Sequence, residues 1–150
     1  MDVFDFFESG RQAWWLEQIG KSDWEAGQFL LSLLREGRLK DLCGESTQVL
    51  LLTEGDALLS FCTYAEQDDI QPTELRPWMG FVYTFPAYRG RRLLGRLFEK
   101  VEALARGQGF PAVYISTNHV GLYEKYGCVF DRILNDINGE PSRVYRRDVG

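Results

Sequence analysis

The sequence of 150 residues predicts a single domain of the α/β (α+β) class, residues 1–150, built around a central mixed sheet. Three observations support this prediction. Three strand-like segments follow one another before residue 85, strands and helices alternate after it, and 45% of the residues are hydrophobic, enough for one core. Because consecutive strands pair antiparallel and a strand–helix–strand passage gives a parallel pair, the sheet should contain both kinds of pairing.

The N-terminal part of the chain predicts two helices between Arg11 and Arg38. Apolar residues recur there at helical spacing, and Gly20 interrupts them. Ser22 or Asp23 is the expected N-cap of the second helix, which Gly37 should end. We therefore expect two helices before the first strand.

The next segments predict three strands. Residues 48–53 and 57–64 are rich in Leu, Val, Phe and Tyr, and Glu54-Gly55-Asp56 between them is typical of a hairpin turn. Residues 78–84 form a third strand that ends before Pro86. After Gly90 the apolar spacing becomes helical, from Leu93 to Ala105. Four shorter elements follow, a strand, a helix and two strands, at residues 113–116, 122–126, 128–134 and 144–147.

The formal net charge of -5 argues against a nucleic-acid-binding protein, which needs a cationic surface. The charges are unevenly spread, however. Acidic residues gather at Glu66, Asp68, Asp69 and Glu74, and basic residues follow at Arg89, Arg91, Arg92, Arg96 and Lys100. The basic stretch suits a small phosphorylated ligand and the acidic one a cationic substrate. On charge alone, two ordinary solvated faces remain the simpler interpretation.

The cysteines and the N-terminus indicate a reducing compartment. Cys43, Cys62 and Cys128 are widely spaced and form no C-x-x-C pair, so neither a disulfide framework nor a metal site is predicted. The first residues are acidic where a signal peptide is basic, and no apolar run reaches membrane-spanning length. We therefore expect a cytoplasmic protein with no membrane partner and no metal.

The junction between the third strand and the following helix is the strongest candidate for a ligand site. The turn Tyr88-Arg89-Gly90-Arg91-Arg92-Leu93-Leu94-Gly95 lies where free amide N–H groups and the helix dipole favour an anion. Gly90 can adopt a positive φ, and the arginines add cationic donors. The turn therefore predicts a diphosphate site, although a helix N-terminus with solvated arginines would have the same local pattern.

This turn resembles motif A of the GNAT family of N-acetyltransferases, with Arg89 and Gly90 at the first two positions of its signature. Residues 115–130, which contain Asn118 and Leu122-Tyr123-Glu124-Lys125, resemble motif B. Arg92 and Leu94 stand where the family usually has Gly and Gly or Ala. The resemblance covers the chain from about residue 48 to its end. It implies the GNAT fold, a sheet of six to seven strands flanked by helices.

The resemblance also implies the cosubstrate and its contacts. Acetyl-CoA would lay its pantetheine arm along the third strand, with the Val82 amide near the thioester carbonyl. Asn118 would contact the cofactor and Tyr123 would be the general acid toward the CoA thiolate. The implied cofactor-binding residues are Phe81, Val82, Tyr83, Thr84, Arg89, Gly90, Arg91, Arg92, Leu93, Leu94, Gly95 and Asn118.

The general base is less defined by the sequence. An amine attacks only when neutral, so a base must take its proton, usually through water. Glu66, Asp68, Asp69 and Glu74 are all candidates, and Glu74 is ranked first because it is nearest the cofactor strand. His119, the only histidine, either assists proton transfer or caps the short helix. The predicted catalytic residues are thus Tyr123, Glu74 and His119.

The function predicted is transfer of an acetyl group from acetyl-CoA to an amine acceptor by direct attack. The alternative is a silent GNAT-fold domain that binds CoA as a sensor or scaffold, supported by Arg92 and Leu94. A dinucleotide-binding unit is set aside, because no G-x-G-x-x-G follows an N-terminal strand. The amine, the acyl chain length and the choice between a monomer and a homodimer stay open.

Overall fold

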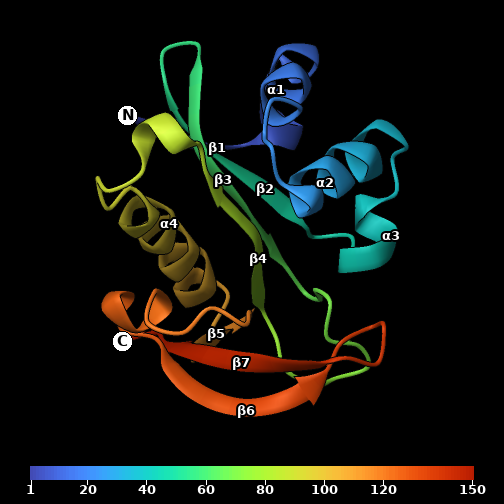
Figure 1. The fold of residues 1–150 in the computed structure, drawn as a ribbon, viewed down its shortest axis with the longest axis vertical. Coiled ribbons are helices and arrows are strands. Elements are labelled where there is room, and N and C mark those ends of the chain that lie inside the picture. Colours follow the sequence, from blue (N-terminus) through green and yellow to red (C-terminus); the bar gives the residue numbers. More distant parts are fainter.

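A seven-stranded mixed sheet runs through the middle of the molecule, with helices packed on both faces (Figure 1). The computed structural model describes residues 1–150 without a gap. The strand order is β1-β2-β3-β4-β5-β7-β6, and every neighbouring pair except β4 and β5 is antiparallel. The predicted mixed, mostly antiparallel sheet is confirmed.

The strands span Asp2–Asp5 (β1), Gln48–Glu54 (β2), Ala57–Ala65 (β3), Trp78–Thr84 (β4), Ala112–Ser116 (β5), Val129–Asn135 (β6) and Pro141–Asp148 (β7). The α-helices span Gln12–Ile19 (α1), Glu25–Arg35 (α2), Leu39–Cys43 (α3) and Leu94–Gly107 (α4). Three short 3₁₀ helices lie at Phe6–Glu8 (η1), Pro86–Tyr88 (η2) and Tyr123–Tyr126 (η3). No helix combines the length and the apolar character needed to cross a bilayer.

The structure differs from the sequence prediction mainly near the N-terminus. Strand β1 and helix α3 were not predicted, because each is too short to show a clear period. The predicted N-cap of α2 is wrong, since the capping position falls on Trp24, which makes no side-chain cap. Ser22 instead donates its hydroxyl hydrogen to the Ile19 carbonyl (2.8 Å), and the Asp23 carboxylate accepts a hydrogen bond from the Tyr83 hydroxyl (2.9 Å).

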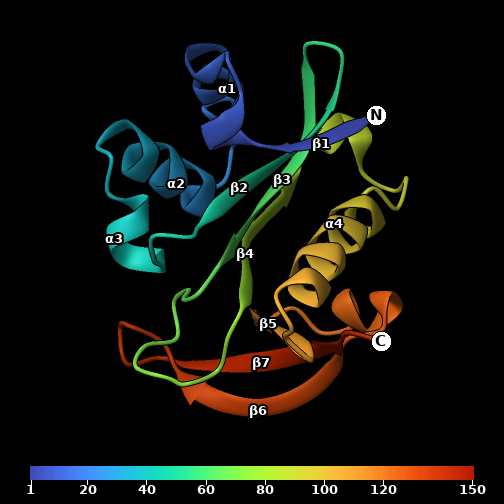
Figure 2. The same ribbon diagram turned by 180° about the vertical axis from the view of Figure 1, so that it is seen from behind.

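Helices α1, α2 and α3 cover one face of the sheet and α4 covers the other, as the two opposite views show (Figure 2). Strand β2 is apolar on both faces for this reason. Val49 and Leu51 pack toward α1 and α2, whereas Leu50 and Leu52 pack toward α4, and all four are fully buried. The three cysteines are buried free thiols in these two cores.

The parallel pair β4 and β5 is held together at one end only. Trp78 pairs with Tyr114, and beyond this point the two strands diverge. On its other side β4 carries a bulge, because Tyr83 faces Phe61 and Gly80 faces Thr63, which leaves two residues of β4 opposite one of β3. The edge of β4 that faces β5 is therefore unpaired from Gly80 to Thr84. This divergence positions the candidate site.

Candidate functional site

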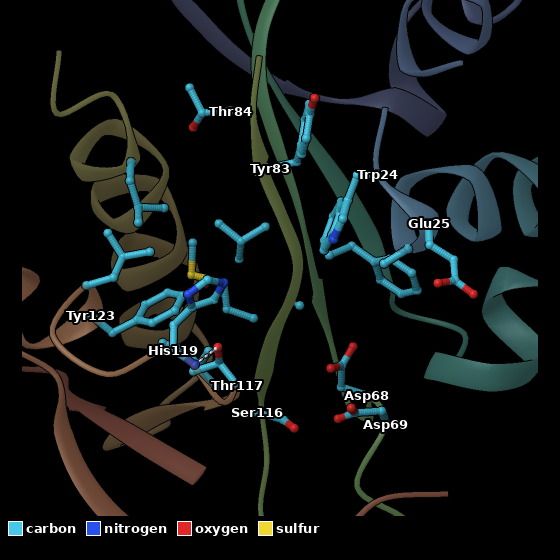
Figure 3. Close-up of a pocket in the computed structure, with 18 of the residues that line it drawn as sticks. Trp24, Glu25, Asp68, Asp69, Tyr83, Thr84, Ser116, Thr117, His119 and Tyr123 are labelled. Carbon is cyan, nitrogen blue, oxygen red and sulfur yellow. Dashed lines mark hydrogen bonds between the residues drawn. The ribbon is translucent and has the colours of Figure 1, made fainter. Parts of the chain in front are cut away.

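A cleft of about 970 Å³ opens where β4 and β5 separate, and β4 runs through its middle (Figure 3). On one side of β4 lies what we call the α4 half, lined among others by Arg89, Gly90, Arg92, Leu93, Leu94 and Tyr123. On the other side lies the α2 half, lined by Trp24, Glu25, Phe29, Leu42, Asp68 and Asp69. The two halves are chemically different.

The turn before α4 presents a row of free amide groups. The N–H groups of the five consecutive residues from Gly90 to Leu94 donate no hydrogen bond within the chain, and the first that does is Gly95 N, to Arg92 O at 3.1 Å. Gly90 and Arg92 both have positive φ angles, 81° and 54°. A backbone of this kind turns successive N–H groups into a common hollow that favours an anion. The backbone of the α4 half is therefore arranged to favour an anion.

The arginines of the turn play different parts. Arg89 lines the cleft, with its guanidinium over the Tyr83 ring (5.4 Å) and its Nε donating to the Thr84 carbonyl (2.8 Å). Arg92 also lines it, and its guanidinium lies 5.0 Å from the centre of the Tyr126 ring. Arg91 is exposed and does not line the cleft.

Gly95 also lies off the cleft, because it faces the Tyr126 ring. A methyl group added to it would meet that ring at 3.6 Å, an ordinary contact. Of the turn residues from 88 to 95, the structure thus brings all but Arg91 and Gly95 into the cleft.

The wall of the cleft is the unpaired part of β4. Phe81, Val82, Tyr83 and Thr84, the residues predicted to contact the cofactor, all line the cleft. Phe81 has a φ of 49°, which is unusual for a bulky residue and is imposed by the bulge. Strained backbone of this kind concentrates at functional sites, where it re-aims side chains and free amides.

Tyr123 enters the α4 half from η3. Its side chain is 5% exposed, and its ring packs edge-on against Phe98 at 6.3 Å. Burial raises the pKa of its phenol well above the ordinary value, and the neighbouring thiols of Cys62 and Cys128 raise it further. Tyr123 therefore stays protonated at neutral pH and can donate a proton into the cleft.

His119 and Asn118 occupy different surroundings. The exposed His119 lines the α4 half, and its backbone N–H donates to the Thr117 hydroxyl at 3.1 Å (Figure 3). No side chain caps η3, so the alternative role of His119 as a helix cap is wrong. Asn118 does not line the cleft; its side-chain oxygen accepts a hydrogen bond from the Arg143 amide at 3.4 Å. A cofactor contact by Asn118 therefore finds no support in its position.

Two adjacent carboxyl groups, those of Asp68 and Asp69, form the floor of the α2 half. Asp68 is 9% exposed, and no Lys or Arg lies within 4.0 Å of either carboxylate. Burial first and the neighbouring Asp69 second raise the pKa of Asp68 to about 7. Burial also raises the pKa of Asp69, whose Oδ1 is buried without a hydrogen-bond partner. The pair therefore holds a proton that it can exchange near neutral pH.

The position of Asp68 is set by backbone contacts and by a glycine. Gln71 donates from its side-chain amide to the carbonyls of Asp68 (2.8 Å) and Leu42 (3.0 Å), and the Ile137 amide donates to the Asp69 carbonyl (2.8 Å). A Cβ built on Gly80 would lie 2.1 Å from Asp68 Oδ1. The absence of a side chain at Gly80 is what lets the carboxyl lie against β4.

Glu74, ranked first as the base, is exposed and does not line the cleft. The segment before β4 folds so that Asp68 and Asp69 reach the cleft, while Glu74 points to solvent. The ranking by distance along the chain is therefore corrected in favour of Asp68, because closeness in sequence to β4 says nothing about the course of the loop.

The apolar walls of the α2 half were not predicted as site residues. They come from Trp24 and Phe29 at the start of α2, Leu42 of α3 and Ile137 between β6 and β7. A helical period marks the face of α2 that packs on the sheet, but it carries no signal for a side chain that faces a cleft beside that surface.

The charges that line the cleft are separated by sign. Its two arginines, Arg89 and Arg92, lie in the α4 half, whereas its acidic residues (Glu25, Asp68, Asp69 and Asp136) lie beyond β4. Such a cleft suits an anionic ligand at one end and a cationic one at the other. No cluster of three or more His, Cys, Asp or Glu side chains is arranged to hold a metal ion.

Comparison with known proteins agrees with this geometry. Residues 9–128 match the model of the acetyltransferase (GNAT) family. No curated protein matches the chain.

Among solved structures, a protein of the GNAT family from Desulfovibrio desulfuricans is similar over 99% of both chains, with a TM-score of 0.67 and 19% identity. The aminoglycoside 6'-N-acetyltransferase from Enterococcus faecium is similar over 100% of this chain and 98% of its own, with a TM-score of 0.67 and 14% identity. An aminoglycoside 6'-N-acetyltransferase complexed with coenzyme A has a TM-score of 0.68 and 12% identity over 100% and 98% of the two chains. At these identities the likeness shows the fold, and it confirms the fold predicted.

Proposed function

Because the chain belongs to the GNAT family of acetyltransferases, we propose that it is an N-acetyltransferase that moves an acetyl group from acetyl-CoA to an amine by direct attack. The observation that supports this most is the division of one cleft into a phosphate-binding half and an acidic half, separated by an unpaired strand. An amine and a thioester bound in these halves would meet beside β4.

The turn before α4 has the groups that a pyrophosphate needs. The amides from Gly90 to Leu94 would hold its oxygens, and the guanidinium of Arg89 would add a cationic donor. Arg92 stands where the family usually has glycine, yet it adopts a positive φ of 54°, so the backbone keeps the course that a glycine would take. The free N–H groups of the turn therefore keep their arrangement, although Arg92 differs from the family pattern.

The free edge of β4 would bind the pantetheine arm, whose amide groups can pair with a strand as a further strand does. The Val82 amide would face the thioester carbonyl and stabilise the negative charge that develops on its oxygen. This assignment explains why β4 and β5 separate next to the bulge instead of pairing along their length.

Asp68, in place of the predicted Glu74, would act as the general base, and Tyr123 would act as the general acid. Asp68 accepts a proton from the amine, directly or through water, and frees the nitrogen lone pair. A bond forms between this nitrogen and the acetyl carbon, the carbon–sulfur bond breaks, and Tyr123 gives its proton to the departing sulfur. The products are an acetamide and CoA thiol, and proton return from solvent and Asp68 restores Tyr123. His119 borders the same half and can relay protons at its mouth.

Calorimetric titration with acetyl-CoA, CoA and dephospho-CoA, paired with a thiol-release assay over a panel of amines, tests the proposal. Binding of acetyl-CoA with thiol release on one class of amine is the expected result. Binding of CoA with no thiol release on any amine would support the alternative of a silent CoA-binding domain, for which the argument is that Arg92 and Leu94 differ from the family pattern. No binding would overturn the cofactor assignment.

A further inference from the structure

The α2 half of the cleft has apolar walls around an acidic floor. Trp24 stacks on Tyr83 with ring centres 5.5 Å apart and planes 12° apart, and Phe29 meets Phe81 at 6.2 Å. Phe29 is 48% exposed and Ile137 47%, although both border the cleft. Single exposed apolar side chains are ordinary, but several that gather around one cavity indicate a binding surface.

No cationic side chain of the protein neutralises the floor of this half. Buried carboxylates are normally paired with a cation or fully hydrogen-bonded. Asp68 is 9% exposed and has no Lys or Arg within 4.0 Å, and Asp69 Oδ1 is buried without any partner. The chain supplies no cation to this floor, so a ligand that enters through the cleft can supply one.

We infer that the acceptor is a small primary amine attached to a flat aromatic body, an arylalkylamine, whose nitrogen lies at Asp68 while its ring packs between Trp24 and Phe29. This inference rests on the proposed function and names the acceptor for it. The ammonium group satisfies the acidic floor, and the ring covers apolar surface that is otherwise left to water. In the reaction the acetyl group passes from the CoA sulfur to this nitrogen, and CoA thiol is released.

The walls argue against acceptors with many polar groups. An aminoglycoside would place hydroxyl groups against Trp24, Phe29, Leu42 and Ile137, none of whose side chains can accept hydrogen bonds from them. Polar groups buried without partners weaken binding strongly. A polyamine would bring a second ammonium group that Glu25 or Asp136 could pair with, but its chain has no ring to cover Trp24 and Phe29, so spermidine tests charge against ring. The one aromatic ring and one cation of an arylalkylamine match the walls and the floor together.

The test measures kcat/KM by thiol release with saturating acetyl-CoA and five acceptors: 2-phenylethylamine, tryptamine, hexylamine, spermidine and kanamycin. We expect the two aromatic amines to exceed hexylamine by about two- to tenfold, the contribution of an aromatic contact, and to exceed the two polycations by more. Hexylamine carries one cation and a similar apolar bulk, so it isolates the contribution of the ring.

Two matched variants locate the contact. Phe29→Ala should lower kcat/KM for the aromatic amines by about two- to tenfold, and the value for hexylamine by less. Phe130→Ala, in which a phenylalanine of similar exposure (46%) outside the cleft is removed, should leave all acceptors unchanged. Thermal unfolding of both variants shows that the fold is retained.

The outcomes are distinct. Preference for spermidine or kanamycin, or equal values for hexylamine and the aromatic amines, would overturn the inference and leave the N-acetyltransferase intact. The same holds if Phe29→Ala and Phe130→Ala behave alike. Acetyl-CoA binding with no thiol release on any amine would overturn the proposed function itself, and the acceptor assignment with it.

Discussion

Replacement of Asp68 by asparagine should make the protein more stable and less active at the same time. Ionising this carboxyl costs free energy in the folded chain, because burial and the neighbouring Asp69 raise its pKa from 3.8 to about 7. Each unit of pKa corresponds to about 1.4 kcal/mol, so the ionised group destabilises the fold by up to about 4 kcal/mol. An amide of nearly the same shape carries no charge and removes this cost.

The size of this stabilisation depends on pH. The folded protein retains the Asp68 proton up to about pH 7, whereas the unfolded chain releases it above its ordinary pKa of 3.8. Wild-type stability attributable to this group therefore falls as pH rises between these two values, and Asp68→Asn should gain on the wild type over the same interval. Between pH 5 and pH 8 the gain should grow by about 2.6 kcal/mol.

Urea denaturation of both proteins at pH 5 and pH 8 measures this gain, and thiol release measures activity. We expect kcat to fall by about 10² to 10⁴, because a general base is lost. The matched control is Glu74→Gln, the same chemical change at an exposed position, which should alter neither quantity. A variant that is less stable than wild type at pH 8, or a gain that is independent of pH, would refute the burial argument, and unchanged kcat would remove Asp68 as the base.

Three further predictions concern the rest of the cleft. Tyr123→Phe should lower kcat by about 10² while leaving the Kd for CoA unchanged, which thiol release and calorimetry separate; full activity would exclude Tyr123 as the acid. Arg89→Ala should weaken CoA binding by about tenfold, whereas Arg91→Ala, outside the cleft, should have a much smaller effect; equal losses would place the phosphates elsewhere. Gly80→Ala should destabilise the fold by about 1–3 kcal/mol in thermal unfolding and also lower kcat, since its methyl group would collide with Asp68 at 2.1 Å; a neutral result would show that the carboxyl is free to move.

The α4 half could be predicted from the sequence because its signals are local. A strand, a turn with glycine and arginine, and an amphipathic helix follow one another within about twenty residues, and each can be recognised by its own period or composition. The structure places Phe81 to Thr84 and Arg89 and Gly90 along the cleft, and their contact with a cofactor stays a prediction. Tyr123 was found through the resemblance of its segment to a known motif.

The α2 half could not be predicted in the same way. Whether Asp68 or Glu74 reaches the cleft depends on hydrogen bonds from Gln71 and Ile137, the second of which lies far along the chain. Phe29 becomes part of a wall only because α2 packs across β4. Neither the position of Asp68 nor that of Phe29 can be predicted from the local amino-acid composition.

The sequence by itself determined the order and kind of most elements, the mixed sheet and the turn at Gly90, since short-range sterics, apolar periods and free helix amides depend on neighbouring residues. Only the tertiary structure decided which strands pair, where β4 and β5 separate, and which carboxyl group is buried. Those features depend on contacts between segments far apart in the chain. Burial and the proximity of a second carboxyl, which raise the pKa of Asp68, exist only once these segments are packed.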